Sequence, residues 1–169
     1  MKSFLYFFLF ILTAANGTAF GSFSCPQTRK IVPVDWQHWK SGGSHFEFKV
    51  TSTGFTIDVT EAGTDKRDIQ VYSNNELQIG KDKSYIVRFK ARSNKDSVTF
   101  NSRLGAEAGD RDYYYRAIKV EKAKRSETKE VRFSQSGEPI KFLKLYFDFG
   151  QIDPGTSIEI SDVEILEEK

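Results

Sequence analysis

Apolar and polar residues alternate along most of this sequence. Phe46, Phe48 and Val50 are separated by polar residues, and Leu143, Leu145 and Phe147 show the same spacing. Because successive side chains of a strand point to opposite faces, this period of two indicates strands with one face on a core and the other toward solvent. No window shows the i, i+3, i+4, i+7 spacing of an amphipathic helix. The sequence therefore predicts an all-β protein.

Short polar segments separate the alternating runs. Ser52–Gly54, Ser73–Asn75, Ser136–Pro139 and Asp153–Gly155 are rich in residues that favour tight turns. About nine strands at this spacing predict an antiparallel β-sandwich, or jelly roll. Since the sequence has no internal repeat and no low-complexity linker, we expect residues 22–169 to form a single domain.

The first 21 residues have the layout of a secretory signal peptide. Lys2 gives a basic start, residues 4–15 are apolar apart from one threonine, and small residues follow up to Gly21. An apolar run of about twelve residues is too short to cross a bilayer. We therefore expect cleavage after Gly21, with Gly17 and Ser24 as alternatives, and a secreted, extracellular protein without a membrane span.

Charge and cysteine content narrow the function classes. The formal net charge is +2, and basic and acidic residues are interleaved along the chain. Without a basic stripe the sequence does not favour nucleic-acid binding. Cys25 is the only cysteine, so no intramolecular disulfide can form and stability must come from the core. Whether Cys25 stays free, pairs with another chain or carries a lipid is left open.

Residues for catalysis are few. His38 and His45 lie before the first clear strand, in what the sequence indicates is a loop, and they lack the spacing of metal ligands. No G-x-S-x-G or H-E-x-x-H motif is present. A pair of carboxylates distant in the sequence could still hydrolyse glycosides, so a small glycan-hydrolysing enzyme is the minor alternative. We expect a protein that is not an enzyme.

Binding has more support, because strand alternation places polar and aromatic side chains outward. Among the aromatic residues, we expect Tyr114, Trp36 and Trp39 to lie on the outer face of a strand or in a loop. A sugar ring has an apolar C–H face and a rim of hydroxyls, so its site needs a flat aromatic ring and planar polar groups. The predicted ligand-binding residues are Gln70, Tyr72, Arg88, Asn101, Arg103, Tyr146 and Asp148, with Gln151 just past a strand end.

The segment DIQVYSNNELQIGKDKSYIVRFKARSNKD resembles carbohydrate-binding modules of the family 4/9 type, whose pattern is G-x-x-Y-x-v-x-F-x-A-R. The closing segment KEVRFSQSGEPIKFLKLYFDFGQIDPGTSIEISDVEIL is similar to the family's last strands. The matching residues are Gln70, Leu77, Gly80, Tyr85, Val87, Phe89, Ala91 and Arg92, then Phe133, Leu145, Phe147, Gly150, Ile158, Ile160, Asp162, Val163 and Ile165. The opening VDWQHWKSGG departs from the family's first strand.

The resemblance implies a galactose-binding-like jelly roll that binds β-glucan, xylan or a related polysaccharide on its concave face. It also implies a structural calcium ion near the first and last strands, with Asp162 as a ligand. Such modules usually accompany a catalytic domain, which this sequence lacks. The main hypothesis is a secreted, non-catalytic polysaccharide-binding protein. The alternative is a secreted structural protein that uses the sandwich to contact a protein partner.

Overall fold

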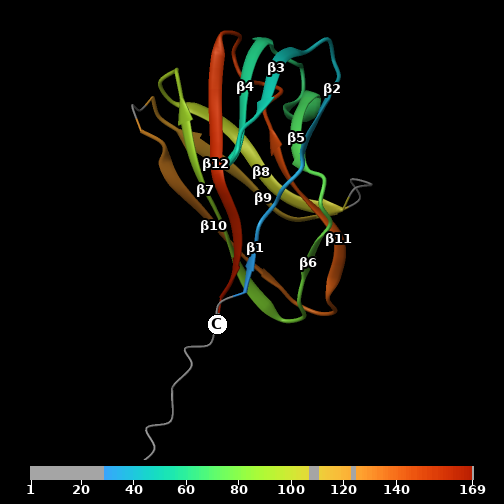
Figure 1. Cartoon of the computed structure of the whole chain (residues 1–169). Helices are drawn as coiled ribbons and strands as arrows, with labels where there is room; N and C mark the ends of the chain where they lie inside the picture. Colours follow the sequence, from blue (N-terminus) through green and yellow to red (C-terminus); the bar gives the residue numbers. More distant parts are fainter. Residues whose placement is uncertain (1–28, 107–110, 123–124, 169) are drawn as a thin grey trace, which may run out of the picture.

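The computed structural model describes residues 29–106, 111–122 and 125–168, which form an antiparallel β-sandwich (Figure 1). This confirms the predicted fold class, although the described residues form twelve strands instead of about nine. The strands are β1 (Lys30–Ile31), β2 (Trp36–Lys40), β3 (His45–Val50), β4 (Gly54–Glu61), β5 (Ile69–Ser73), β6 (Leu77–Ile79), β7 (Lys83–Ser93), β8 (Val98–Ala106), β9 (Asp112–Val120), β10 (Glu127–Gln135), β11 (Ile140–Asp148) and β12 (Thr156–Glu167). The alternation pattern did not predict the short strands β1, β2 and β6.

Two sheets make up the sandwich. In sheet I the strand order is β10-β7-β12-β4-β3, with β1 added beside β12. In sheet II the order is β2-β5-β11-β8-β9, with β6 added beside β11. Neighbours in each sheet are mostly distant in sequence, so each half of the chain contributes strands to both layers. Figure 1 shows the two layers facing each other, with β12 in one and β11 in the other.

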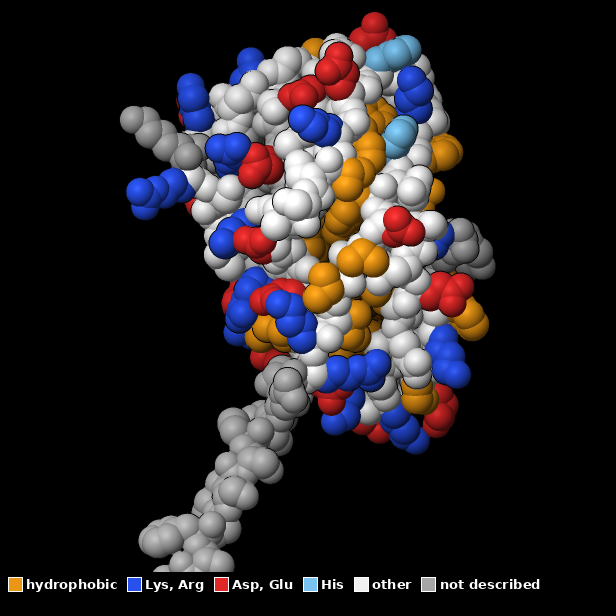
Figure 2. Space-filling model, in the orientation of Figure 1, with side chains coloured by type: hydrophobic (Ala, Val, Ile, Leu, Met, Phe, Trp, Pro, Cys, Tyr) orange, Lys and Arg blue, Asp and Glu red, His pale blue; other side chains and the backbone are white. Residues whose placement is uncertain are grey.

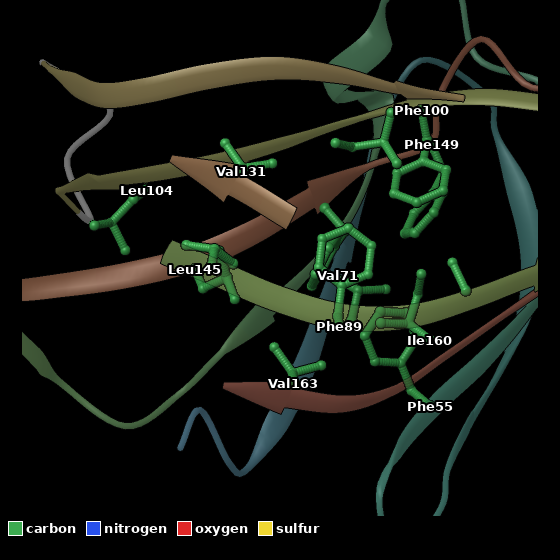
Figure 3. Packing of buried hydrophobic residues seen from close by; sticks show 14 of the residues in the cluster. Phe55, Val71, Phe89, Phe100, Leu104, Val131, Leu145, Phe149, Ile160 and Val163 are labelled. Atoms are coloured by element: carbon green, nitrogen blue, oxygen red, sulfur yellow. The ribbon is translucent and has the colours of Figure 1, made fainter. Parts of the chain in front are cut away.

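The core fills the space between the sheets. Phe55 of β4, Phe89 of β7 and Phe147 of β11 are completely buried. Their rings are in contact, with centroids 5.7 Å apart for Phe55 and Phe147 and 5.1 Å apart for Phe89 and Phe147. Figure 3 shows Phe100 and Phe149 packed side by side in the same cluster. Because the rings come from both sheets, their burial holds the layers together.

Strand alternation assigns most inward residues correctly, but two aromatic residues were placed wrongly. Tyr114 was expected on the surface and is buried, with its hydroxyl 2.7 Å from that of Ser102. In β9 the inward set is Tyr114, Ile118 and Val120, which keeps a regular period of two and turns Tyr115 outward. Trp36 is also buried, because β2 is a strand whose first residue packs against Phe55 and Phe147.

Both histidines lie in strands. His38 lies in β2 and His45 begins β3, so the expected loop over these residues is wrong. The His38 ring contacts Phe46 and Phe48, with centroids 5.3 and 4.9 Å away.

The predicted signal peptide and Cys25 lie outside the described residues. No helix in the described ranges is long and apolar enough to cross a membrane.

A short 3₁₀ helix, η1 (Lys66–Asp68), leads into β5 and is fixed by one carboxylate. Asp68 accepts hydrogen bonds from the Ser41 hydroxyl at 2.6 Å and from the backbone N–H groups of Thr64 and Asp65, each at 2.8 Å. These donors, the Ser41 hydroxyl first, lower the pKa of Asp68 to about 2. The carboxylate therefore connects the segment that follows β2 with the loop that leads into β5.

Candidate functional site

The outer face of sheet II gathers polar and aromatic side chains from five neighbouring strands. We call these residues the sheet II face. One cross-strand row is Trp39, Gln70, Asp148 and Asn101, and the next is Gln37, Tyr72, Tyr146, Arg103 and Tyr115. Lys144 lies one step further along β11. Because the strands are in register, residues far apart in sequence become lateral neighbours.

An ion-pair network lies at the centre of this face. Arg103 Nε lies 3.2 and 3.4 Å from the two carboxylate oxygens of Asp148, and its Nη1 lies 3.1 Å from Asp112. Arg67 continues the network with an Nη2 contact of 2.8 Å to Asp112. Gln70 donates its amide N–H to Asp148 at 3.0 Å. The side chains of Arg103 and Asp148 are 4% and 0% exposed, so these contacts replace water for both charges.

Burial and pairing act in opposite directions on Asp148. Loss of hydration is the larger effect and raises the pKa of Asp148 to about 6, although the Arg103 and Arg67 charges and the Gln70 amide lower it. At the rim of the face, partial burial and the Asp148 charge raise the pKa of the Tyr115 hydroxyl. Asp148 therefore changes its charge in the mildly acidic range, close to the residues that face solvent.

Cations cover part of the tyrosine surface. The Arg103 guanidinium carbon lies 3.7 Å from the centre of the Tyr146 ring, and Lys144 Nζ lies 5.1 Å from that of Tyr72. The two tyrosine rings contact each other, with centroids 5.6 Å apart. Tyr146 is only 6% exposed, whereas Trp39 at the β2 edge is 48% exposed. Trp39 is thus the ring of this face with the most open surface for a ligand.

Six of the eight predicted ligand-binding residues lie together on this face: Gln70, Tyr72, Asn101, Arg103, Tyr146 and Asp148. The expectation that Arg88 belongs with them is wrong, because β7 is in sheet I. Arg88 is paired there with Glu130 at 2.8 Å and with Glu164 at 3.2 Å. Gln151 lies beyond the end of β11 and donates to the Thr64 carbonyl at 3.0 Å. Arg88 and Gln151 therefore have their partners away from the other six predicted residues.

The outer face of sheet I is lined with paired charges. Lys90 contacts Asp162 at 2.8 Å, Arg92 pairs with Glu159, and Arg132 pairs with Glu130 and Glu168. Figure 2 shows the resulting mixture of basic and acidic side chains on the side where β7 and β12 lie. A hollow of about 620 Å³ lies on this face and is lined by Thr56, Asp58, Arg92, Ser93, Asn94, Lys122, Ser157 and Glu159. It has no aromatic lining residue and is separate from the sheet II face.

Asp162, which the family resemblance implies as a calcium ligand, has a basic neighbour in this structure. Its carboxylate is paired with the Lys90 ammonium group, and that positive charge would repel a cation. Among the described residues, no three or more His, Cys, Asp or Glu side chains are grouped closely enough to hold a metal ion. Because calcium takes six to eight oxygen ligands that include backbone carbonyls and water, the calcium site near Asp162 stays a prediction.

The structure adds residues that the sequence analysis did not place on the face. Trp39 and Gln37 reach it because β2 pairs with β5, and Tyr115 reaches it because it is paired with Arg103 of β8. Asp112 joins through Arg103. Gly105 leaves room for this pair, since a Cβ atom there would lie 2.7 Å from the Asp112 carboxylate. The sequence signal for β2 was the alternation of its side chains, with Gln37 and Trp39 on one face and His38 and Lys40 on the other.

Solved carbohydrate-binding modules have the same fold. A CBM4 module superposes with a TM-score of 0.66 at 18% identity, covering 83% of this chain and 95% of the module. The N-terminal cellulose-binding domain of Cellulomonas fimi β-1,4-glucanase C gives a TM-score of 0.57 at 15% identity, with coverage of 83% and 95%. At such identities these likenesses concern the fold. A search of curated proteins gives no match.

The family assignment comes from the sequence match. The family model described as a carbohydrate binding domain, of the 4/9 type, matches residues 21–156, well over half of the chain. This match confirms the resemblance seen in the strand pattern around Gly80 to Arg92. The chain belongs to the carbohydrate-binding domain family.

Proposed function

We propose that this chain is a secreted, non-catalytic protein that binds a polysaccharide on the sheet II face. The observation that carries the proposal is the contrast between the two outer faces. On sheet I the arginine and lysine side chains are neutralised by adjacent carboxylates. On sheet II, two cross-strand rows combine aromatic rings with amides and charged groups. Only the second arrangement offers both stacking and hydrogen bonding to a sugar.

The chemistry of the face suits a ligand with many hydroxyls. Trp39 presents an open indole surface at one edge, and the half-buried Tyr115 lies toward the other. Gln37 on β2 and Gln70 on the neighbouring β5 offer amide groups that both donate and accept. The buried Arg103–Asp148 pair keeps the neighbouring strands and side chains in place. A polysaccharide chain bound on this face can contact these groups, and β-glucan and xylan are the classes that the family resemblance suggests.

Two observations support a binding role without catalysis. Two carboxylates at this face, those of Asp112 and Asp148, both contact Arg103. Asp148 is completely buried, so its oxygens are out of reach of a glycosidic bond. Hydrolysis by two carboxylates needs both groups beside the scissile bond.

Export is supported by the basic, apolar and small-residue order of the first 21 residues.

The test is binding to insoluble cellulose, mixed-linkage β-glucan and xylan, followed by titration calorimetry with the ligand that is retained. We expect the wild type to bind one of these classes. Trp39→Ala should lower the affinity about tenfold, which corresponds to about 1.4 kcal/mol of stacking free energy. Arg88→Ala is the control, because Arg88 lies on sheet I and should leave affinity unchanged.

Three results would contradict the proposal. Failure of the folded wild type to bind any glycan would favour the protein-partner alternative. Equal losses for Trp39→Ala and Arg88→Ala would remove the sheet II face as the site. Release of shorter products from labelled oligosaccharides would show that the protein is an enzyme.

A further inference from the structure

Phe142 in β11 has a backbone conformation that its side chain disfavours. Its φ is 59°, in the left-handed region that bulky residues rarely adopt. The other non-glycine residues with positive φ in the described ranges are Asp35, Asp82, Ser97 and Asp162, all of them small and polar. The Phe142 side chain is also 63% exposed, so no burial in the core compensates for the conformation. The fold alone gives no reason for a phenyl ring at this position.

A β-bulge produces this conformation. Ile140 pairs with Ile79 and Leu143 pairs with Leu77, so two residues of β11 lie opposite the single residue Gln78 of β6. Bulges of this kind redirect side chains and often lie beside binding sites. Ile140 packs against the core and Leu143 is buried, whereas Lys141 and Phe142 are both exposed. The bulge therefore turns an aromatic ring out of a strand that otherwise contributes to the core.

Phe142 is continuous with the sheet II face. Its neighbour Leu143 is buried in the core, so the exposed Phe142 side chain lies on the outer side of sheet II, which also carries Lys144, Tyr146 and Asp148. At about 3.3 Å per residue, Phe142 lies roughly 13 Å along the strand from Tyr146. This separation is larger than one sugar ring. Only an oligomeric ligand can contact both the ring of Phe142 and the two cross-strand rows.

We propose that Phe142 is a second aromatic contact for the polysaccharide, which stacks on a sugar unit outside the two cross-strand rows. This inference rests on the proposed function and adds that the ligand is recognised as an extended chain of several sugar units. The exposed ring and its strained backbone are then explained together, since strained residues persist where the conformation serves a function.

The test compares Phe142→Gly and Phe142→Trp with the wild type on cello- and xylo-oligosaccharides of three and six units and on the parent polysaccharides. Glycine fits the positive φ without a steric penalty, so Phe142→Gly should keep or raise the melting temperature. Its affinity should fall about tenfold for the hexasaccharide or the polysaccharide and less than twofold for the trisaccharide. Phe142→Trp should retain the wild-type affinity. Val50→Ala, which shortens another exposed apolar side chain, is the control and should change nothing.

The outcomes separate this inference from the proposed function. Wild-type affinity of Phe142→Gly at every ligand length overturns the inference alone. A clear drop in melting temperature for Phe142→Gly also overturns it, because the ring would then have a structural role. Equal losses on short and long ligands contradict a separate contact. If the wild type binds no saccharide, the proposed function fails and this inference fails with it.

Discussion

Replacing Asp148 by asparagine tests which force dominates at the centre of the sheet II face. The substitution keeps the shape of the side chain and removes its charge. Gln70 can still hydrogen-bond to the new amide, and Arg103 keeps its contact of 3.1 Å with Asp112. The variant therefore removes the buried negative charge without leaving Arg103 as an unpaired buried cation.

The expected size follows from the pKa of Asp148. Burial raises this pKa from 3.8 to about 6, even though Arg103 and Arg67 favour the charged form. A folded-state pKa above the unfolded value means that the stabilising contribution of Asp148 is fully present below about pH 4 and is lost as the pH rises through about 6. Two pKa units correspond to about 3 kcal/mol, because one unit is about 1.4 kcal/mol. Asp148→Asn does not titrate and should avoid this loss.

Urea unfolding at pH 4 and at pH 7.5 measures the effect. The variant and the wild type should have similar free energies of unfolding at pH 4, where Asp148 is largely protonated. At pH 7.5 the variant should be the more stable by up to about 3 kcal/mol. A carboxyl-carbon NMR titration of the wild type should give a midpoint near pH 6 for Asp148. A variant that is less stable than the wild type at pH 7.5, with a smaller deficit at pH 4, would show that the Arg103 attraction exceeds the cost of burial.

Two further predictions concern the loops around η1. Asp68 has a pKa lowered to about 2, so its contribution to stability is present above about pH 4 and is lost as the pH falls toward 2. Asp68→Asn should therefore be destabilised at pH 7 in urea unfolding, and its deficit should shrink near pH 2; a deficit independent of pH would contradict the assigned role of the charge. Gly150→Ala should lower the free energy of unfolding by roughly 1–3 kcal/mol, because its Cβ would lie 2.1 Å from the Asp65 carbonyl oxygen. Thermal unfolding measures this loss, and an unchanged melting temperature would show that the η1 loop can move away freely.

Much of the fold could be predicted because it depends on local alternation. Phe55, Ile57 and Val59 are buried in β4, and Leu143, Leu145 and Phe147 are buried in β11, as the period of two predicted. The same rule turned Gln70, Tyr72, Tyr146 and Asp148 outward. Alternation failed where another effect intervened: β2 is short, and β9 carries the polar Arg116 at an inward position near the edge of its sheet.

The composition of the candidate site was less predictable, because alternation tells which side of a strand a residue faces but not which sheet the strand joins. Alternation turns both Arg88 and Arg103 outward, yet the first lies in sheet I and the second in sheet II. Their partners differ accordingly, with two glutamates for Arg88 and two aspartates for Arg103. Trp39 entered the site only through the pairing of β2 with β5.

The sequence by itself determined the all-β class, the inward and outward sides of most strands and the family of the domain, since these depend on residue spacing along the chain. Only the tertiary structure decided which outward residues meet, that Asp148 and Arg103 are buried on an outer face, and that a bulge exposes Phe142. The physical reason is that cross-strand register and burial arise from contacts between residues distant in sequence. A strand's own sequence does not specify those partners.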